Sequence, residues 1–432
     1  MRKSVFPALL LFAVGPIAFG QTPAPKLTLK DAEALALKNH PQILAAENEV
    51  GYANQQVVET RSAYYPTVNA DVTGSQANNG ARIGAGYLTD SRLFNHFGQG
   101  ITMSQLITDV GRTPNLVASS RFQAQATAKN YQASRYDVLL QVNRAYVDAL
   151  HAQSVIRVAE ETVAARQLLL DQVSELAKNK LRSQLDVSFT DVNVSEAKLL
   201  LLRAQDAVQE AFAELSRALG SDHSVNYQLV DEPLPPSPAA NVDDLIVQAM
   251  NNRPELASFR YSREAAYKFA DAEKDLSRPT VSFIGVAGYI PYIAQLTSQQ
   301  IPSEYEGAGV NVNIPVFNGH LFSARRQAAW YRALEADQRL RNEQERVARD
   351  VRVAWASAMT AYQRIDVTAQ FLRQATLALD LAQGRYNLGL SSIVELTQAQ
   401  LNVTQAEIEN LSGKYDYESQ YSALQYSLGL LQ

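Results

Sequence analysis

The amino-acid sequence predicts a mainly α-helical fold with strands suited to a membrane β-barrel, in which a unit of two strands plus a long coiled-coil helical hairpin occurs twice. Three observations lead to this prediction. Motifs recur at a nearly constant separation, two helical patterns each continue for more than sixty residues, and short segments alternate polar with apolar side chains.

The first twenty residues are expected to be a secretory signal peptide. Arg2 and Lys3 precede an apolar run from Val5 to Phe19, with small residues at the expected cleavage position, as in such peptides. No later stretch approaches the roughly 18 uninterrupted apolar residues that a transmembrane helix requires. We therefore expect any membrane crossing to be made by strands.

The internal repeat is visible in two short segments, "KNHPQILAAE" at 38–47 and "NNRPELASFR" at 251–260. Their prolines, Pro41 and Pro254, lie 213 residues apart, and a Pro-Thr-Val triplet recurs at the same separation. Further along, the pair Leu219-Gly220 recurs 209 residues later. The chain therefore holds two copies of one structural module of about two hundred residues.

Each unit is expected to contain two strands of about ten residues. Thr67, Asn69 and Asp71 in the first unit, and Asn311 and Asn313 in the second, alternate with apolar residues, which is the period of a strand with one polar face. The expected strands span about 66–75, 98–107, 280–289 and 307–316. This length suits a tilted strand that crosses a bilayer. Four strands are fewer than the roughly eight of the smallest outer-membrane barrels, so we expect the chain to oligomerise.

The middle of each unit is predicted to be one very long helix. Apolar and small residues recur in steps of three and four, with a mean of 3.5, and Pro is absent from 115–178 and 323–386. This spacing keeps one side of a helix against its partners over many turns, and more than sixty residues would extend roughly 90 to 100 Å. A second helix then folds back in each unit, which gives helical hairpins over about 113–219 and 321–428.

The repeat divides the chain into four expected segments. They are the signal peptide 1–20, the first repeat 21–220, a Pro-rich linker 221–241 and the second repeat 242–432. The chain has no Cys and a formal net charge of −5, with acids and bases interspersed. Disulfides and thiolate zinc sites are thereby excluded, and we expect no nucleic-acid partner because no positive patch would face phosphates.

In order and duplication, these features resemble the TolC family of outer-membrane efflux channels over essentially the whole mature chain. The resemblance rests on the segments "LKNHP" and "MNNRP", "YPTV" and "RPTV", "IPVFNGH", and "GRYNLGLSSIVELTQAQ". It implies a homotrimer whose four strands per subunit form one twelve-stranded β-barrel, continued by an α-helical barrel across the periplasm. The long loops at about 77–96 and 291–305 would then lie outside the cell.

The resemblance also implies a function and partners. The chain would be a passive exit duct in the cell outer membrane, for efflux or type I secretion, recruited by a periplasmic adaptor (membrane fusion protein) and an inner-membrane pump. An alternative is a periplasmic coiled-coil adaptor or structural protein, which should show a small β-domain that we do not find in the sequence. We expect no enzyme activity and no cofactor, since the five histidines are scattered without metal-ligand spacing.

The hairpin turns carry the candidate site residues, and these follow from the resemblance. Tyr386 matches the family's tyrosine before the second turn, Glu395 its first acidic gate position, and Asp186 the equivalent acid of the first hairpin. Gln398 stands where the family often has a second acid. Arg182 could supply a cation that the second turn lacks. The resemblance therefore implies a periplasmic gate at these five residues.

Overall fold

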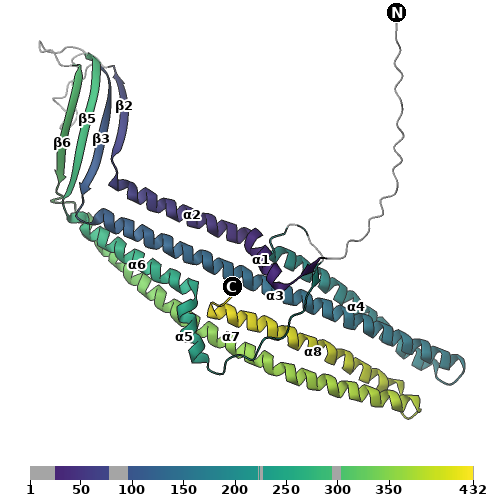
Figure 1. Ribbon diagram of the computed structural model, residues 1–432. Helices are drawn as coiled ribbons and strands as arrows, with labels where there is room; N and C mark the ends of the chain where they lie inside the picture. Colours follow the sequence, from purple (N-terminus) through teal and green to yellow (C-terminus); the bar gives the residue numbers. More distant parts are fainter. Residues whose placement is uncertain (1–24, 77–95, 222, 224–226, 294–302, 432) are drawn as a thin grey trace, which may run out of the picture.

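The computed structural model describes residues 25–76, 96–221, 223, 227–293 and 303–431. It is elongated, with a β-sheet at one end and two helical hairpin turns at the other (Figure 1). The expected signal peptide and most of both long loops lie outside the described residues.

The helices of the two units correspond in length and order. Those of the first unit are α1 (Leu29–Asn39), α2 (Pro41–Arg61), α3 (Arg112–Lys178) and α4 (Gln184–Ala218). Those of the second unit are α5 (Val242–Asn252), α6 (Pro254–Lys274), α7 (Leu321–Asn387) and α8 (Ile393–Leu428). Both α3 and α7 contain 67 residues, which corresponds to about 100 Å at 1.5 Å per residue. The two rods predicted from the sequence are thus present.

Local sequence signals set the starts of the short helices. The Thr28 hydroxyl accepts a hydrogen bond from the Asp31 amide at the start of α1, and His40 Nδ1 accepts one from the Gln42 amide at the start of α2. Pro41 occupies the first position of α2, where a residue without an N–H costs nothing. The motif around Pro41 therefore makes a sharp break between two helices, and Pro254 occupies the same place in α6.

The sheet contains four antiparallel strands in the order β2-β3-β5-β6. Their bounds are Thr67–Ser75 for β2, His96–Thr108 for β3, Thr280–Ile293 for β5 and Glu304–Asn313 for β6. Thr67 pairs with Ser104, Ser104 with Ile284, and Thr280 with Asn313. Because side chains alternate along a strand, this register puts Thr67 and Asn313 on one face, so the polar faces of both units coincide.

The last strand ends earlier than the sequence analysis expected. β6 ends at Asn313 rather than near residue 316, because Pro315 lacks the N–H that a ladder hydrogen bond would need. Val316 and Phe317 beyond it are 93% and 82% exposed. The alternation of Val310 and Val312 is therefore part of the sheet, whereas its continuation to Val316 is not.

The segment between the two units returns to the start of the first. β4 (Gln228–Leu229) pairs in parallel with β1 (Lys26–Leu27). The buried hydroxyl of Tyr146 on α3 lies 2.8 Å from two carbonyl oxygens, those of Leu27 and Val230, and can donate its hydrogen to either. Part of the expected linker is thereby fastened to the first unit, which sequence patterns did not indicate.

Small side chains dominate the contacts between the long helices. Fully buried positions on α3 and α7 include Ala149, Ala159, Ala333 and Ala358, each at 0% exposure. Such residues let helix backbones approach closely. Across the helices that the structure describes, none combines the length and the apolar character needed to span a bilayer.

Candidate functional site at the hairpin turns

The two helical hairpins end side by side, far from the sheet (Figure 1). An apolar cluster joins them just above the turns. It contains Leu169 and Val173 of α3, Ala382 and Tyr386 of α7, and Ile393, Leu396 and Ala399 of α8. This packing places the turn residues of the first hairpin next to those of the second.

Arg182 and Tyr386 form a direct link between the hairpins. Arg182 Nη2 donates to the Tyr386 carbonyl oxygen at 3.0 Å, and its guanidinium carbon lies 4.2 Å from the centre of the Tyr386 ring. The position of the guanidinium over the ring is a cation–π geometry. The arginine of the first turn therefore contacts both the backbone and the aromatic ring of Tyr386 at the end of α7.

The hydroxyl of Tyr386 takes no part in this link. Tyr386 is 4% exposed, and its hydroxyl oxygen is buried without a hydrogen-bond partner among the described residues. Burial raises the pKa of the Tyr386 hydroxyl, an effect that the Arg182 charge opposes and the Asp186 charge reinforces. The side chain is neutral at physiological pH and contributes its ring rather than its polar atom.

Asp186 is engaged in capping the helix that follows the first turn. Its Oδ2 accepts a hydrogen bond from the Ser183 amide at 3.3 Å, while the Ser183 hydroxyl oxygen accepts one from the Asp186 amide at 3.1 Å. This reciprocal pair is a capping box, which satisfies two amides at the start of α4. Asp186 is thus held at the turn by a local structural role.

Glu395 and Gln398 lie on α8 and have other partners. The Ser392 hydroxyl oxygen accepts a hydrogen bond from the Glu395 amide at 3.4 Å, and the Glu395 carboxylate pairs with Arg385 Nε at 3.3 Å. Gln398 Nε2 donates to Asn402 Oδ1 at 3.1 Å. Of the five predicted residues, the contacts described here join only Arg182 with Tyr386; Asp186, Glu395 and Gln398 each have a separate local partner.

Arg385 is a site residue that the sequence analysis missed. The Glu395 and Arg385 side chains are 45% and 57% exposed, so their attraction is screened by solvent. The arginine nevertheless places a positive charge 3.3 Å from the acid proposed for the gate. Its position, ten residues before Glu395 across a Gly-containing turn, was a signal that could have revealed it.

A second polar link lies further up the hairpins. Arg166 of α3 is 5% exposed and donates from Nη1 to the Asn193 carbonyl oxygen at 2.9 Å, with Glu196 at 3.8 Å. Burial lowers the pKa of the Arg166 guanidinium, which the Glu196 charge partly offsets. Asn193 Nδ2 in turn donates to Thr397 Oγ1 of α8 at 3.1 Å. Within a heptad pattern Arg166 resembles a surface residue, which is why this link was not predicted.

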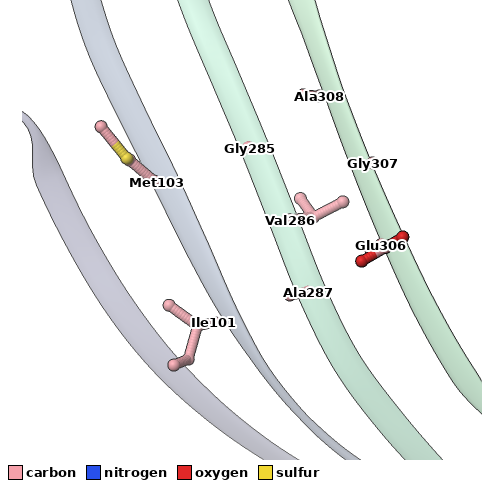
Figure 2. A pocket seen from close by; sticks show the side chains of 8 residues that line it. All are labelled: Ile101, Met103, Gly285, Val286, Ala287, Glu306, Gly307 and Ala308. Carbon is pink, nitrogen blue, oxygen red and sulfur yellow. The ribbon is translucent and has the colours of Figure 1, made fainter.

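The sheet carries a shallow hollow of about 630 Å³. Figure 2 shows Ile101 and Met103 on β3 and Glu306 on β6, with Gly285 and Ala287 of β5 between them. The small residues of β5 create the hollow because they leave the space between larger neighbours unfilled. Its open lining offers a single charged group, which is too little to define a ligand site.

A charged cluster joins the sheet end of the helices. Glu273 of α6 is 3% exposed, and its carboxylate oxygens accept hydrogen bonds from Arg325 Nε at 2.7 Å and Nη2 at 3.0 Å. Arg112 Nη2 at the start of α3 lies 3.8 Å from Glu273 Oε1. One buried acid therefore ties α3, α6 and α7 together where the strands begin. Over the described ranges, no three His, Asp or Glu side chains gather in a metal-binding arrangement.

Comparison with known proteins places this architecture. The family model described as "Outer membrane efflux protein" matches residues 34–221 and 245–430, one match for each unit. The chain is 24% identical to outer membrane efflux protein BepC of Brucella suis biovar 1 (strain 1330), over 96% of this chain and 89% of that protein. It is 22% identical to outer membrane protein TolC of Salmonella enteritidis, over 96% and 86% of the two chains.

The fold is shared with solved channel structures. A crystal structure of CusC, from work on its folding and transmembrane channel formation, aligns with a TM-score of 0.80 at 19% identity, and covers 93% of this chain and 92% of CusC. The sequence-based resemblance to the TolC family and the predicted fold class are confirmed, and the family is one of channels rather than of enzymes. The chain belongs to the outer membrane efflux protein family and is a TolC-like efflux channel.

Proposed function

We propose that this chain forms a homotrimeric exit duct in the cell outer membrane. Four strands from each of three subunits close a twelve-stranded β-barrel, and the long helices continue it as an α-helical barrel through the periplasm. Substrates enter from a periplasmic adaptor and an inner-membrane pump, for efflux or for type I secretion. The duct is passive, so the pump supplies the energy.

One observation supports this proposal most strongly. The sheet has one polar face and two edge strands, β2 and β6, that have no strand partner beyond β3 and β5 among the described residues. In lipid an unpaired backbone group costs several kcal/mol, and an open edge invites pairing with another chain. A closed ring of subunits satisfies both edges and turns the polar faces towards a water-filled lumen.

The length of the helices supports the periplasmic part of the proposal. Both 67-residue helices run from the sheet to the hairpin turns (Figure 1), which is about 100 Å. A rod of this length suits a tunnel that reaches out of the outer membrane towards an inner-membrane partner. The relatives named above include an efflux protein and TolC, in keeping with a role in export.

We further propose that the hairpin turns form the periplasmic gate. Arg182 and Tyr386 hold the two hairpins of a subunit together, and three copies of Glu395 would line the narrow end of the duct. Asp186 caps the helix that follows the first turn. Because Gln398 is neutral, this ring would carry one acid per subunit instead of two. Adaptor binding would open the gate by separating the hairpins.

The mass of the purified protein in detergent tests the assembly. We expect light scattering to give a trimer, and planar-bilayer recordings to show discrete conductance steps. A monodisperse monomer that retains the full helical circular-dichroism spectrum would contradict the proposal. Release from cells by osmotic shock, instead of with the outer membrane, would contradict the location.

A further inference from the structure

One tyrosine lies across the polar face of the sheet, which is the face that carries Thr67 and Asn313. Tyr305 is near the start of β6, and β6 begins at the end of the sheet far from the helices (Figure 1). Tyr305 pairs with Gly288 of β5, and Gly288 in turn pairs with Gly100 of β3. Because side chains alternate along a strand, Tyr305 shares the face of Asn313.

The two glycines make room for the tyrosine ring. A Cβ atom at Gly288 would overlap Cζ, Cε1 and the hydroxyl oxygen of Tyr305, and one at Gly100 would overlap the same hydroxyl oxygen. The ring therefore extends from β6 across β5, with its hydroxyl end at β3. An aromatic side chain that covers glycines of neighbouring strands helps to fix such a sheet. Tyr305 is still 42% exposed, so part of its ring is open above the polar face.

An acidic residue lies at the far end of this row. Asp71 of β2 is exposed and pairs with Gly100. Its Cβ lies about 4.5 to 5.5 Å from the position that a Cβ would take at Gly100, which is where the Tyr305 hydroxyl lies. Within their bounds the four strands contain no Lys or Arg. The Asp71 carboxylate and the open ring are therefore neighbours on a face without a basic strand residue.

We propose that Tyr305 and Asp71 form a binding site for organic cations on the wall of the duct. An aromatic ring attracts a positive charge and also offers apolar contact, and the carboxylate supplies an opposite charge beside it. A molecule that joins an alkylated ammonium group to an apolar body would use both groups. This inference rests on the proposed function, because the polar face becomes the wall of a lumen only in the closed barrel, and it adds a class of substrate.

The site should bind such cations weakly. A cation–π contact at an exposed position raises affinity about 2- to 5-fold, and a unit charge pair about 5 Å apart in water raises it about fourfold. Together the two groups would raise affinity about 8- to 20-fold. Weak binding suits a duct, because a molecule that passes through it must also leave.

The opposite face of the sheet provides a matched comparison. Tyr289 of β5 is also 42% exposed, and Glu306 of β6 is an acid as Asp71 is. Tyr289 directly follows Gly288 and Glu306 directly follows Tyr305, so both side chains lie on the other face. Figure 2 shows Glu306 there, beside the apolar residues of the hollow. Changes at these two positions therefore repeat the chemistry outside the proposed lumen.

Block of the single-channel current by benzyltrimethylammonium tests the site. The purified trimer is recorded in planar bilayers at low salt, and the half-blocking concentration is measured against the unblocked current of each variant. We expect Tyr305→Leu to raise this concentration about 2- to 5-fold and Asp71→Asn to raise it about fourfold. The effect of Asp71→Asn should fade in 1 M salt, where the Debye length is about 3 Å. Tyr305→Phe keeps the ring and should retain the block.

Matched variants separate the site from a general change in the barrel. Gly288→Ala keeps both binding groups but displaces the ring, and should weaken the block as Tyr305→Leu does. Gly309→Ala lies on the same face, where a Cβ would meet no atom within 4 Å, and should leave the block unchanged. Tyr289→Leu and Glu306→Gln, on the other face, should also leave it unchanged.

The possible outcomes distinguish this site from the duct itself. If Tyr305→Leu, Asp71→Asn and Gly288→Ala leave the block unchanged, or if the variants of the other face weaken it equally, the proposed site is overturned. Discrete conductance steps from a trimer would still support the duct in that case. A monomeric mass without conductance would instead overturn the proposed function, and the site with it.

Discussion

Replacing Arg182 with alanine should loosen the first hairpin from the second. The substitution removes a hydrogen bond of 3.0 Å to the Tyr386 carbonyl oxygen and a guanidinium positioned 4.2 Å from the ring centre. A hydrogen bond from a charged group contributes about 1.5 to 3 kcal/mol, and a cation–π contact about 1 kcal/mol. Because Arg182 is only half-buried, solvent screening reduces the sum to about 1 to 2 kcal/mol.

That energy is large enough to measure as a change in population. A loss of 1 to 2 kcal/mol shifts an equilibrium between joined and separated hairpins by about 5- to 30-fold. Spin labels on cysteines at Asn179 and Leu390, in trimers diluted with unlabelled chains, would report the distance between the turns. We expect a longer and broader distance distribution in Arg182→Ala, together with a higher single-channel conductance in planar bilayers.

Two matched variants separate the parts of this link. Tyr386→Phe should match the unaltered protein, because the Tyr386 hydroxyl has no partner in the described chain and phenylalanine keeps both ring and carbonyl. Tyr386→Leu should lose the ring contact while it retains the hydrogen bond, and should give an intermediate result. If Arg182→Ala leaves both readouts unchanged, or Tyr386→Phe alters them, the proposed link is not what joins the hairpins.

Three further predictions concern charged groups. Glu395→Gln should lower the cation preference of the channel at low salt, because it removes the charge proposed for the gate. Arg385→Gln should raise this preference, because it frees the Glu395 carboxylate from a partner at 3.3 Å. Reversal potentials in a salt gradient measure both effects, and an unchanged potential in both variants would refute the charge ring. Burial raises the pKa of Glu418 to about 7 from 4.5, with Lys414 opposing the shift, so the folded protein keeps a proton that the unfolded chain releases, and stability should fall as the pH rises from about 4.5 to 7. Thermal melts at pH 5 and pH 8 should show this fall. The variant Glu418→Gln should abolish the fall and should be more stable than the unaltered protein by about 1 kcal/mol at pH 8, after allowance for screening. An equal change in stability between pH 5 and pH 8 in the variant and in the unaltered protein would contradict the assignment. Glu273→Gln removes a 3% exposed acid from between two arginines and should cost about 2 to 4 kcal/mol in thermal stability, while the exposed control Glu335→Gln should cost less than about 1 kcal/mol.

Much of the fold could be read from the sequence because its signals are periodic and local. The repeated motif around Pro41 and Pro254 indicated two equivalent breaks between helices, and both breaks are present. The only Pro in the two long helices is Pro114 in the first turn of α3, where it is tolerated, so each helix could continue for 67 residues. At β6, in contrast, the alternation of valines outweighed Pro315 in our prediction, and the strand ends before that proline.

The candidate site was only partly accessible from the sequence. The resemblance to the family indicated Tyr386, and the equivalent turn of the first repeat indicated Arg182; the structure brings these two residues into contact. The role of Arg385 beside Glu395 and the buried position of Arg166 were missed. An arginine on a long helix has the same local pattern whether it faces water or a neighbouring hairpin, so sequence alone does not separate these cases.

By itself the sequence determined the repeat, the two rods and the two-faced strands, because each depends on the spacing of residues along one segment. The tertiary structure alone decided which strands pair, in which register, and how part of the linker returns to β1. It also decided that Tyr386 acts through its ring and carbonyl and not through its hydroxyl. These features depend on contacts between residues that are distant in the chain, whose geometry is set by packing and not by any local pattern.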